Sequence, residues 1–182
     1  MIAVFTALAI ATDFAMVPLV NIKLMDTLVF VAALAFGFRV GASVAGLTWL
    51  VYGTLSPWGF ASGPFIVLLM LSEMIYAALG SIAARFAGWM KWGTAERSAA
   101  FGFLGFFGAL AYDLNTIITP AVLSGIPLVS SVFSLIPAMP FMFAHEASDF
   151  VFFSTLGPVL YATMLRVGRT RFASGQLVTA TQ

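Results

Sequence analysis

Charged residues are scarce in this chain. Asp, Glu, Lys and Arg make up only 8% of its 182 residues, whereas apolar residues make up 62%. A soluble globular protein of this composition would have too little polar surface to cover its core. The composition therefore predicts a membrane protein. At about 20 residues per spanning helix, the chain can hold about five or six crossings in a single transmembrane domain over residues 1–182.

Cysteine is absent, and histidine occurs once, at position 145. The chain therefore forms no disulfide, thiolate metal site or cysteine nucleophile. The net charge of +1 excludes the clustered Lys and Arg of an extended nucleic-acid-binding surface, so no nucleic acid is expected as a partner. Stretches such as TLVFVAALAFGF are apolar all round, so helices are the expected spanning element and the fold class is all-α.

Prolines, glycines and charges divide the chain into six predicted helices. The second and third are joined almost directly at 37–41, which predicts a tight hairpin. Segment 124–138, bounded by prolines, is predicted to be a helical loop that dips into the bilayer, where protein must cover its backbone. The N-terminus lacks the basic region of a signal peptide and carries Asp13, so we interpret it as a retained helix. The predicted helices cover residues 1–20, 25–38, 40–55, 64–89, 96–122 and 139–167, with a flexible tail at about 169–182.

The basic residues give the predicted bundle an orientation. In a six-span arrangement, seven of the eight Lys and Arg residues fall on one side, and only Lys23 falls on the other. Because positive loops stay in the cytoplasm, both termini are predicted to be cytoplasmic.

Six of the seven acidic residues lie in predicted helices or near their extracellular ends. An unpaired charge at the bilayer centre costs on the order of 3 kcal/mol, so these groups must face the bundle interior, form pairs or be protonated. A rise of about 1.5 Å per residue places five of them in one layer of the outer half, namely Asp13, Glu73, Asp113, Glu146 and Asp149. The predicted ligand pocket is lined by Glu73, Tyr76, Tyr112, Asp113, His145, Glu146 and Asp149, and shielded by Trp49, Tyr52 and Trp58.

Two alternatives stay open at this layer. Any single Trp or Tyr is explained equally well by an interhelical hydrogen bond or an interfacial aromatic belt, whereas Glu73, Asp113 and Asp149 together favour a functional site. Asp13 either binds ligand or pairs with Lys23. Because an anion would meet repulsion from the acids, a cationic or donor-rich ligand such as a thiamine-like heterocycle is favoured.

The stretch HEASD at 145–149 has the form of the zinc-protease motif HExxH, with Asp149 in place of the second histidine. With only one histidine, the third ligand would have to be a carboxylate, and such an oxygen-rich site is unusual for catalytic zinc. No Gly-x-Ser-x-Gly elbow occurs either. We therefore expect a non-catalytic protein without a metal or cofactor. An intramembrane metalloenzyme and a purely structural histidine are the alternatives.

Ala3, Ala7, Ala11 and Ala15 recur every four residues and so share one side of the first helix. Asp13 points to the opposite side. Because this acid must face inward, the alanine stripe is predicted to face lipid or a partner helix, which small residues allow to approach closely. The fifth predicted helix also has a face of small residues, formed by Gly102, Gly105 and Gly108. We expect this face to pack against another helix of the same chain.

These features together resemble the S components of energy-coupling factor (ECF) transporters, which are small six-helix prokaryotic membrane proteins. The alanine series resembles the family's docking face for the transmembrane coupling subunit. The stretch FGFRVGASVAGLTWLVYGTLSPWG resembles the hairpin and the loop that lids the ligand. LAYDLNTIITPAVLSGIPL and PFMFAHEASDFVFFSTLGPVLYATML resemble the fifth and sixth helices, although Ser148-Asp149 stands where a Ser-Asn pair is often seen.

The resemblance implies high-affinity capture of a water-soluble vitamin or vitamin precursor at a prokaryotic cytoplasmic membrane. The implied partners are the coupling subunit and two cytosolic ATPases. The chain contains no P-loop, so ATP hydrolysis belongs to those partners. The main alternative is a stand-alone proton-coupled secondary transporter, for which the expected inverted repeat is not found.

Overall fold

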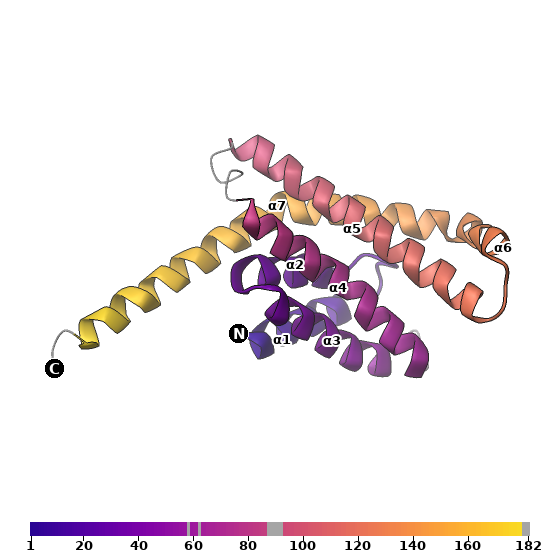
Figure 1. Ribbon diagram of the computed structural model, residues 1–182, viewed down its shortest axis with the longest axis horizontal. Helices are drawn as coiled ribbons and strands as arrows, with labels where there is room; N and C mark the ends of the chain where they lie inside the picture. The colour runs from indigo at the N-terminus through magenta and orange to yellow at the C-terminus, as the bar shows by residue number, and fades with distance from the viewer. Residues whose placement is uncertain (58, 62, 87–92, 180–182) are drawn as a thin grey trace.

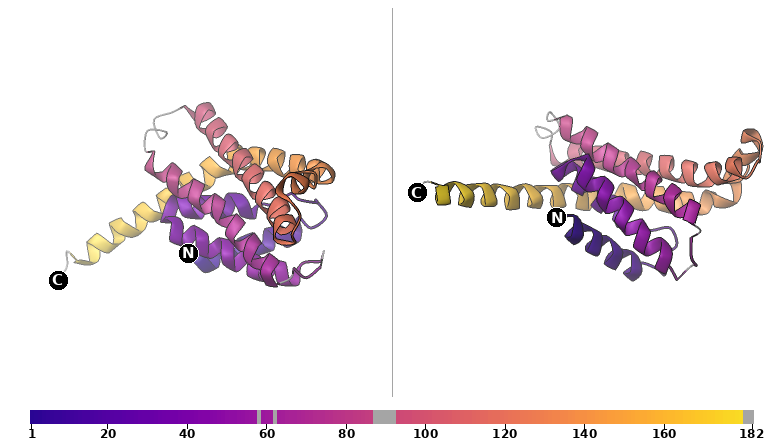
Figure 2. Two further views of the ribbon diagram at one scale, coloured as in Figure 1. Left: turned by 45° about the vertical axis from the view of Figure 1, so that its right-hand side comes forward. Right: turned by 60° about the horizontal axis from the view of Figure 1, so that its bottom comes forward.

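The computed structural model describes residues 1–57, 59–61, 63–86 and 93–179. These residues form seven α-helices and no strand, which confirms the all-α class (Figure 1). The ends marked N and C lie toward one end of the bundle, and α6 lies at the other (Figures 1 and 2). The helices are α1 (Ile2–Ala15), α2 (Met25–Phe36), α3 (Phe38–Leu55), α4 (Gly63–Arg85), α5 (Thr94–Leu123), α6 (Leu128–Val132) and α7 (Leu135–Thr179).

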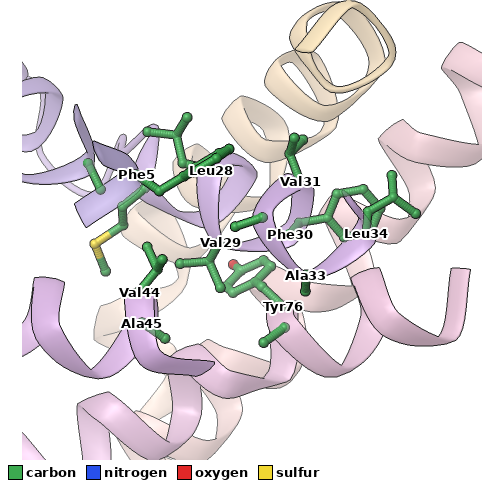
Figure 3. Close-up of a cluster of buried hydrophobic side chains, with 14 of the residues drawn as sticks. Phe5, Leu28, Val29, Phe30, Val31, Ala33, Leu34, Val44, Ala45 and Tyr76 are labelled. Atoms are coloured by element: carbon green, nitrogen blue, oxygen red, sulfur yellow. The ribbon is translucent and has the colours of Figure 1, made fainter. Parts of the chain in front are cut away.

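Helix α2 forms the centre of the bundle. It contacts α1, α3, α4 and α7, and every residue from Met25 to Leu34 is buried. A helix that is apolar all round is stable only when other helices cover it on every side. Figure 3 shows Val29 and Phe30 of α2 among the side chains of Phe5, Val44 and Tyr76. The central position carries Asp26, in the first turn of α2, into the protein interior.

The tight hairpin predicted between the second and third helices is confirmed. Gly37 alone separates α2 from α3 and has a φ of 89°, a left-handed conformation that glycine adopts without steric cost. Four residues later, a Cβ on Gly41 would lie 2.5 Å from the Cβ of Ala33. The two helices therefore pack with almost no side chain between them.

Helices α5 and α7 lie side by side along the bundle (Figures 1 and 2). The glycine face of α5 provides the close contact, as the sequence predicted: Gly102 packs on Phe150, Gly105 on Phe153, and Gly108 on Tyr76 of α4. The Cβ atom that any other residue would add at Gly105 would lie 2.7 Å from the backbone oxygen of Asp149. Only glycine lets α7 approach this closely.

Several helix boundaries differ from the predicted ones. Helix α1 ends at Ala15 rather than at 20, because Pro18 has no N–H and disfavours a helical conformation in the residue before it. Segment 124–138 holds α6 and the start of α7. The last helix begins at Leu135 rather than at 139, since Pro137 falls in its first turn, where proline is tolerated.

The C-terminal end of α7 also differs from the prediction. The helix runs to Thr179, past the predicted end at 167 and into the predicted tail. Its last part extends beyond the other helices (Figure 2). The flexibility of the tail stays a prediction.

Two helices among the described residues are long and apolar enough to cross a membrane. The most apolar 18-residue windows of α4 and α5 have mean hydropathies of 2.0 and 1.4, and 39% of each window is buried inside the protein. Most residues of these windows therefore face outward, unlike those of a core helix in a soluble protein. Helices α1 and α2 are apolar but shorter. The length and hydropathy of α4 and α5 thus support membrane association. The six-span arrangement stays a prediction.

Candidate functional site

His145 of α7 joins three helices through its two ring nitrogens. Its Nδ1 atom lies 3.1 Å from both carboxylate oxygens of Asp113 on α5, and its Nε2 atom lies 3.0 Å from Oδ2 of Asp26 on α2. The ring is only 2% exposed. Because a carboxylate accepts but does not donate hydrogen bonds, Nδ1 carries the hydrogen that points to Asp113.

A second pair of hydrogen bonds surrounds this histidine. The hydroxyl group of Tyr76 on α4 donates to Oδ2 of Asp149 at 2.8 Å and lies 3.4 Å from Nε2 of His145. The indole N–H of Trp49 on α3 donates to Oε2 of Glu73 at 3.2 Å. The six residues that meet here, which we call the acid–histidine cluster, are Asp26, Glu73, Tyr76, Asp113, His145 and Asp149.

Helical spacing and the glycine face of α5 explain how the cluster assembles. Tyr76 follows Glu73 by three residues and Asp149 follows His145 by four, so each pair shares one face of its helix. On α5, a Cβ on Gly108 would lie 2.7 Å from the ring of Tyr76. The absence of that atom allows α4 to approach α5 closely near Asp113.

Several polar atoms of the site are buried without a hydrogen-bond partner among the described residues. They are Oε1 of Glu73, Oδ1 of Asp149, the hydroxyl oxygen of Tyr112 and both carboxylate oxygens of Asp13. A buried polar group without a partner costs about 1–3 kcal/mol. Such groups point to a function, or to a ligand or ion that completes their bonding.

A cavity of about 550 Å³ lies next to the cluster and shares Asp113 with it. The connecting segments after α1 and α3 contribute to its walls, as do α3, α5 and the start of α7. Its volume falls in the range of about 300–1,000 Å³ that is typical of small-molecule sites. The charged and aromatic residues of its lining, among the described residues, are Asp13, Lys23, Trp49, Tyr52, Phe65, Tyr112, Asp113 and Phe141.

Lys23 shows how the cavity holds a positive charge. Its Nζ atom lies 4.2 Å from the ring centroid of Trp49 and 5.5 Å from that of Tyr52, in a cation–π arrangement. Among the described residues, Asp13 and Lys23 form no ion pair within 4 Å. Pairing with Lys23 therefore does not account for the burial of Asp13, which is 1% exposed.

The structure divides the predicted pocket residues into two groups. Trp49, Tyr52, Tyr112 and Asp113 line the cavity. The others lie outside its lining, and Glu146, which is 8% exposed, takes no part in the hydrogen bonds of the cluster. Trp58 lies outside the described residues. The group behind the cavity wall consists of Glu73, Tyr76, His145 and Asp149.

The predicted docking stripe lies on the outer face of α1. Ala3, Ala7, Ala11 and Ala15 are all exposed, and Asp13 on the opposite face is buried. This is the arrangement that the helical period predicted.

Asp26 and Lys23 are the site residues that the sequence analysis did not select. Asp26 is an acid in the first turn of an otherwise apolar helix, and this isolated polar position was the available signal. Lys23 was considered only as a partner for Asp13.

Comparison of the chain with protein-family models, with curated proteins and with solved structures yields no match.

Proposed function

We propose that this chain is the substrate-binding S component of an ECF transporter, which captures a water-soluble vitamin or vitamin precursor for ATP-driven uptake. The observation that carries the proposal is the cavity of about 550 Å³, whose wall combines two buried acids with five aromatic side chains. In the proposed topology, α1 to α5 and α7 cross the membrane and both termini are cytoplasmic. The cavity, at the opposite end, then opens to the outside.

The outer surface of the bundle supports placement in lipid. Large apolar side chains are exposed on α1, α3, α4, α5 and α7, including Val4 at 67%, Phe103 at 55% and Phe143 at 71%. A soluble monomer rarely exposes so much apolar surface in contiguous patches. The short helices α1 and α2 are then held at membrane depth by their neighbours.

The charges of the cavity support a cationic or donor-rich ligand. Asp13 and Asp113 contribute two carboxylates, and Lys23 contributes one ammonium group. Lys23 already places a cation over the ring of Trp49, so a ligand cation in the same position gains the attraction of the ring and of both acids. A thiamine-like heterocycle has this chemistry, and biotin, as an anion, does not.

Calorimetry on the purified full chain tests the ligand assignment, with thiamine and biotin as the two probes. We expect thiamine to bind at least tenfold more tightly than biotin. Asp13→Asn should weaken thiamine binding, because Asp13 lines the cavity. Glu146→Gln, a matched carboxylate-to-amide change outside the cavity lining, should not. Equal affinities for the two probes would contradict the charge argument.

Native mass spectrometry of gently purified protein tests the broader proposal without a choice of probe. A retained small molecule that is lost on Asp13→Asn is the expected result. A chain that retains nothing and binds no vitamin of a comprehensive panel would contradict the assignment as a binding component.

The alanine stripe of α1 supports a docking function in the same proposal. Small exposed residues let a second helix backbone approach closely within the bilayer. Ala7→Trp combined with Ala11→Trp should leave ligand binding intact and prevent co-purification with a co-expressed coupling subunit and its ATPases. Ala162→Trp, at an exposed alanine of α7, is the control. A complex that survives the double change would rule out this docking face.

The acid–histidine cluster favours a second candidate, a stand-alone proton-coupled transporter. His145 bridges Asp26 and Asp113, and chains of acids and histidine carry protons in such proteins. Proton-driven substrate uptake by proteoliposomes that contain this chain alone would favour it over the S component.

A further inference from the structure

The contact between His145 and Asp26 requires a positive species between two acceptors. Nδ1 of His145 already carries a hydrogen toward Asp113, so the neutral ring presents a lone pair at Nε2. This lone pair faces Oδ2 of Asp26 at 3.0 Å. Two acceptor atoms at this distance repel each other unless a proton or a metal ion lies between them.

The other groups around Nε2 favour the metal ion. Oδ2 of Asp149 lies 3.9 Å from Nε2, and the hydroxyl group of Tyr76 lies 3.4 Å away. A proton on Nε2 can bond well to only one of these oxygens. It would also leave Oδ1 of Asp149, one of the three candidate ligands, buried without a partner. A divalent ion attracts all of these carboxylates at once, and buried charges that lack a partner ion pair commonly bind metals.

The spacing of the candidate ligand atoms fits one ion. One ligand atom each from Asp26, His145 and Asp149 lies within 4.8 Å of the other two. Zinc with tetrahedral angles and bonds of about 2.0–2.2 Å to nitrogen and oxygen holds its ligand atoms about 3.3–3.6 Å apart. Nε2 of His145 and Oδ2 of Asp26 already lie 3.0 Å apart, so Asp149 has to move toward this pair by up to about 1 Å to complete the site.

We propose that Asp26, His145 and Asp149 bind a divalent first-row transition metal ion. Tyr76 holds the carboxylate of Asp149 through its hydrogen bond. Asp113 acts as a positioning residue, because a metal-binding histidine donates its second ring N–H to a carboxylate that fixes the ring. No metal was expected from the sequence, because the chain has only one histidine and the third ligand would have to be a carboxylate. Asp26 supplies that ligand from a helix 119 residues away in the chain.

One imidazole nitrogen and two carboxylate oxygens make a mixed ligand set. Imidazole suits zinc and iron, carboxylates also suit manganese, and affinity rises from Mn²⁺ toward Zn²⁺. We therefore expect Zn²⁺ to bind more tightly than Mn²⁺, and Mg²⁺ to bind most weakly, because it prefers oxygen ligands and retains its waters.

The metal site is separate from the proposed ligand cavity. Among the described residues, the cavity lining does not include Asp26, His145 or Asp149. Asp13 lines the cavity and is not one of the three candidate metal ligands. Asp113 lines the cavity and also contacts His145. The metal proposal can therefore fail while vitamin capture holds, and the reverse is also true.

The test uses the purified full chain in detergent. Its metal content is measured by mass spectrometry before treatment with a chelator, and the stripped protein is then titrated calorimetrically with Zn²⁺, Mn²⁺ and Mg²⁺. We expect one Zn²⁺ per chain. Asp26→Asn and His145→Gln should each weaken Zn²⁺ binding at least 100-fold, and Asp113→Asn should weaken it about 10–100-fold. Glu146→Gln, next to His145 on α7, is the matched control and should bind as the unaltered protein does.

Cobalt provides a readout of the ligands themselves. Co²⁺ in the site should give a visible absorption spectrum that shifts in Asp113→Asn and disappears in His145→Gln. Circular dichroism and gel filtration check each variant for folding, and Asp149→Asn replaces any variant that does not fold. Absence of saturable Zn²⁺ binding by the unaltered chain would overturn the proposal. So would unchanged affinity in folded Asp26→Asn and His145→Gln.

Discussion

The hydroxyl groups of Tyr76 and Tyr112 provide a paired test of how the buried site is stabilised. Both side chains are buried, at 0% and 5% exposed, and Phe removes only one oxygen atom from each. The hydroxyl of Tyr76 donates to Asp149 at 2.8 Å. The hydroxyl of Tyr112 has no partner among the described residues.

Tyr76→Phe should lower the free energy of unfolding by about 1.5–3 kcal/mol, the usual contribution of a hydrogen bond to a charged group. The loss should lie toward the upper end, because Oδ1 of Asp149 is already unbonded and the change leaves the whole carboxylate without a donor from Tyr76. Tyr112→Phe removes a buried hydroxyl that has no partner. Its effect should be within about 0.5 kcal/mol of zero or stabilising by about 1 kcal/mol.

Both variants are compared with the unaltered chain after chelator treatment, so that bound metal does not contribute. Unfolding is followed by tryptophan fluorescence in mixed micelles with increasing SDS, and the free energies are compared at a common detergent composition. An equal loss in the two variants would refute the reasoning, because it would mean that the ring packing and not the hydrogen bond determines the result. A loss below about 0.5 kcal/mol for Tyr76→Phe would also refute it.

Three further predictions concern other parts of the site. Gly105→Ala should lower the free energy of unfolding by about 1–3 kcal/mol in the same assay, because the new Cβ would meet the Phe153 ring and the Asp149 backbone; Gly63→Ala, which has open space around it, should change it little. Trp49→Phe should cost about 1–3 kcal/mol, because it leaves Glu73 without the indole donor, and a neutral result would show that this bond contributes nothing. Lys23→Met should strengthen thiamine binding severalfold in calorimetry, because the ammonium no longer occupies the position over Trp49; weaker binding would show that Lys23 itself contacts the ligand.

Local patterns in the sequence were sufficient to predict much of the bundle. The continuous apolar run of α2 indicated a helix, and the direct connection at 37–41 indicated the hairpin that follows it. The four-residue spacing of the alanines in α1 placed them opposite Asp13, and the structure has that acid buried and the stripe exposed. Each of these features depends on helical period or on the conformational freedom of one residue, so each can be derived from a short segment.

The helix ends were harder to predict, for a reason that is also physical. Pro18 ended α1 early, whereas Pro137, in the first turn of α7, did not delay that helix. The same residue type ends a helix or is tolerated in its first turn, depending on which N–H groups need partners. Packing against the neighbouring helices decides where that first turn lies.

Only the tertiary structure decided which polar groups meet. The cost of a charge in the bilayer predicted that the acids face the interior, but it did not show which helix each acid packs against. The contact of Asp26 with His145 spans 119 residues, and the glycine face of α5 lets α7 and α4 each approach α5 closely around it. The same packing separated Asp113, which lines the cavity, from Glu73 and Asp149, which lie behind it. Composition and period determined that this protein has a buried polar layer, and the packing of α2, α5 and α7 determined which groups of that layer lie together.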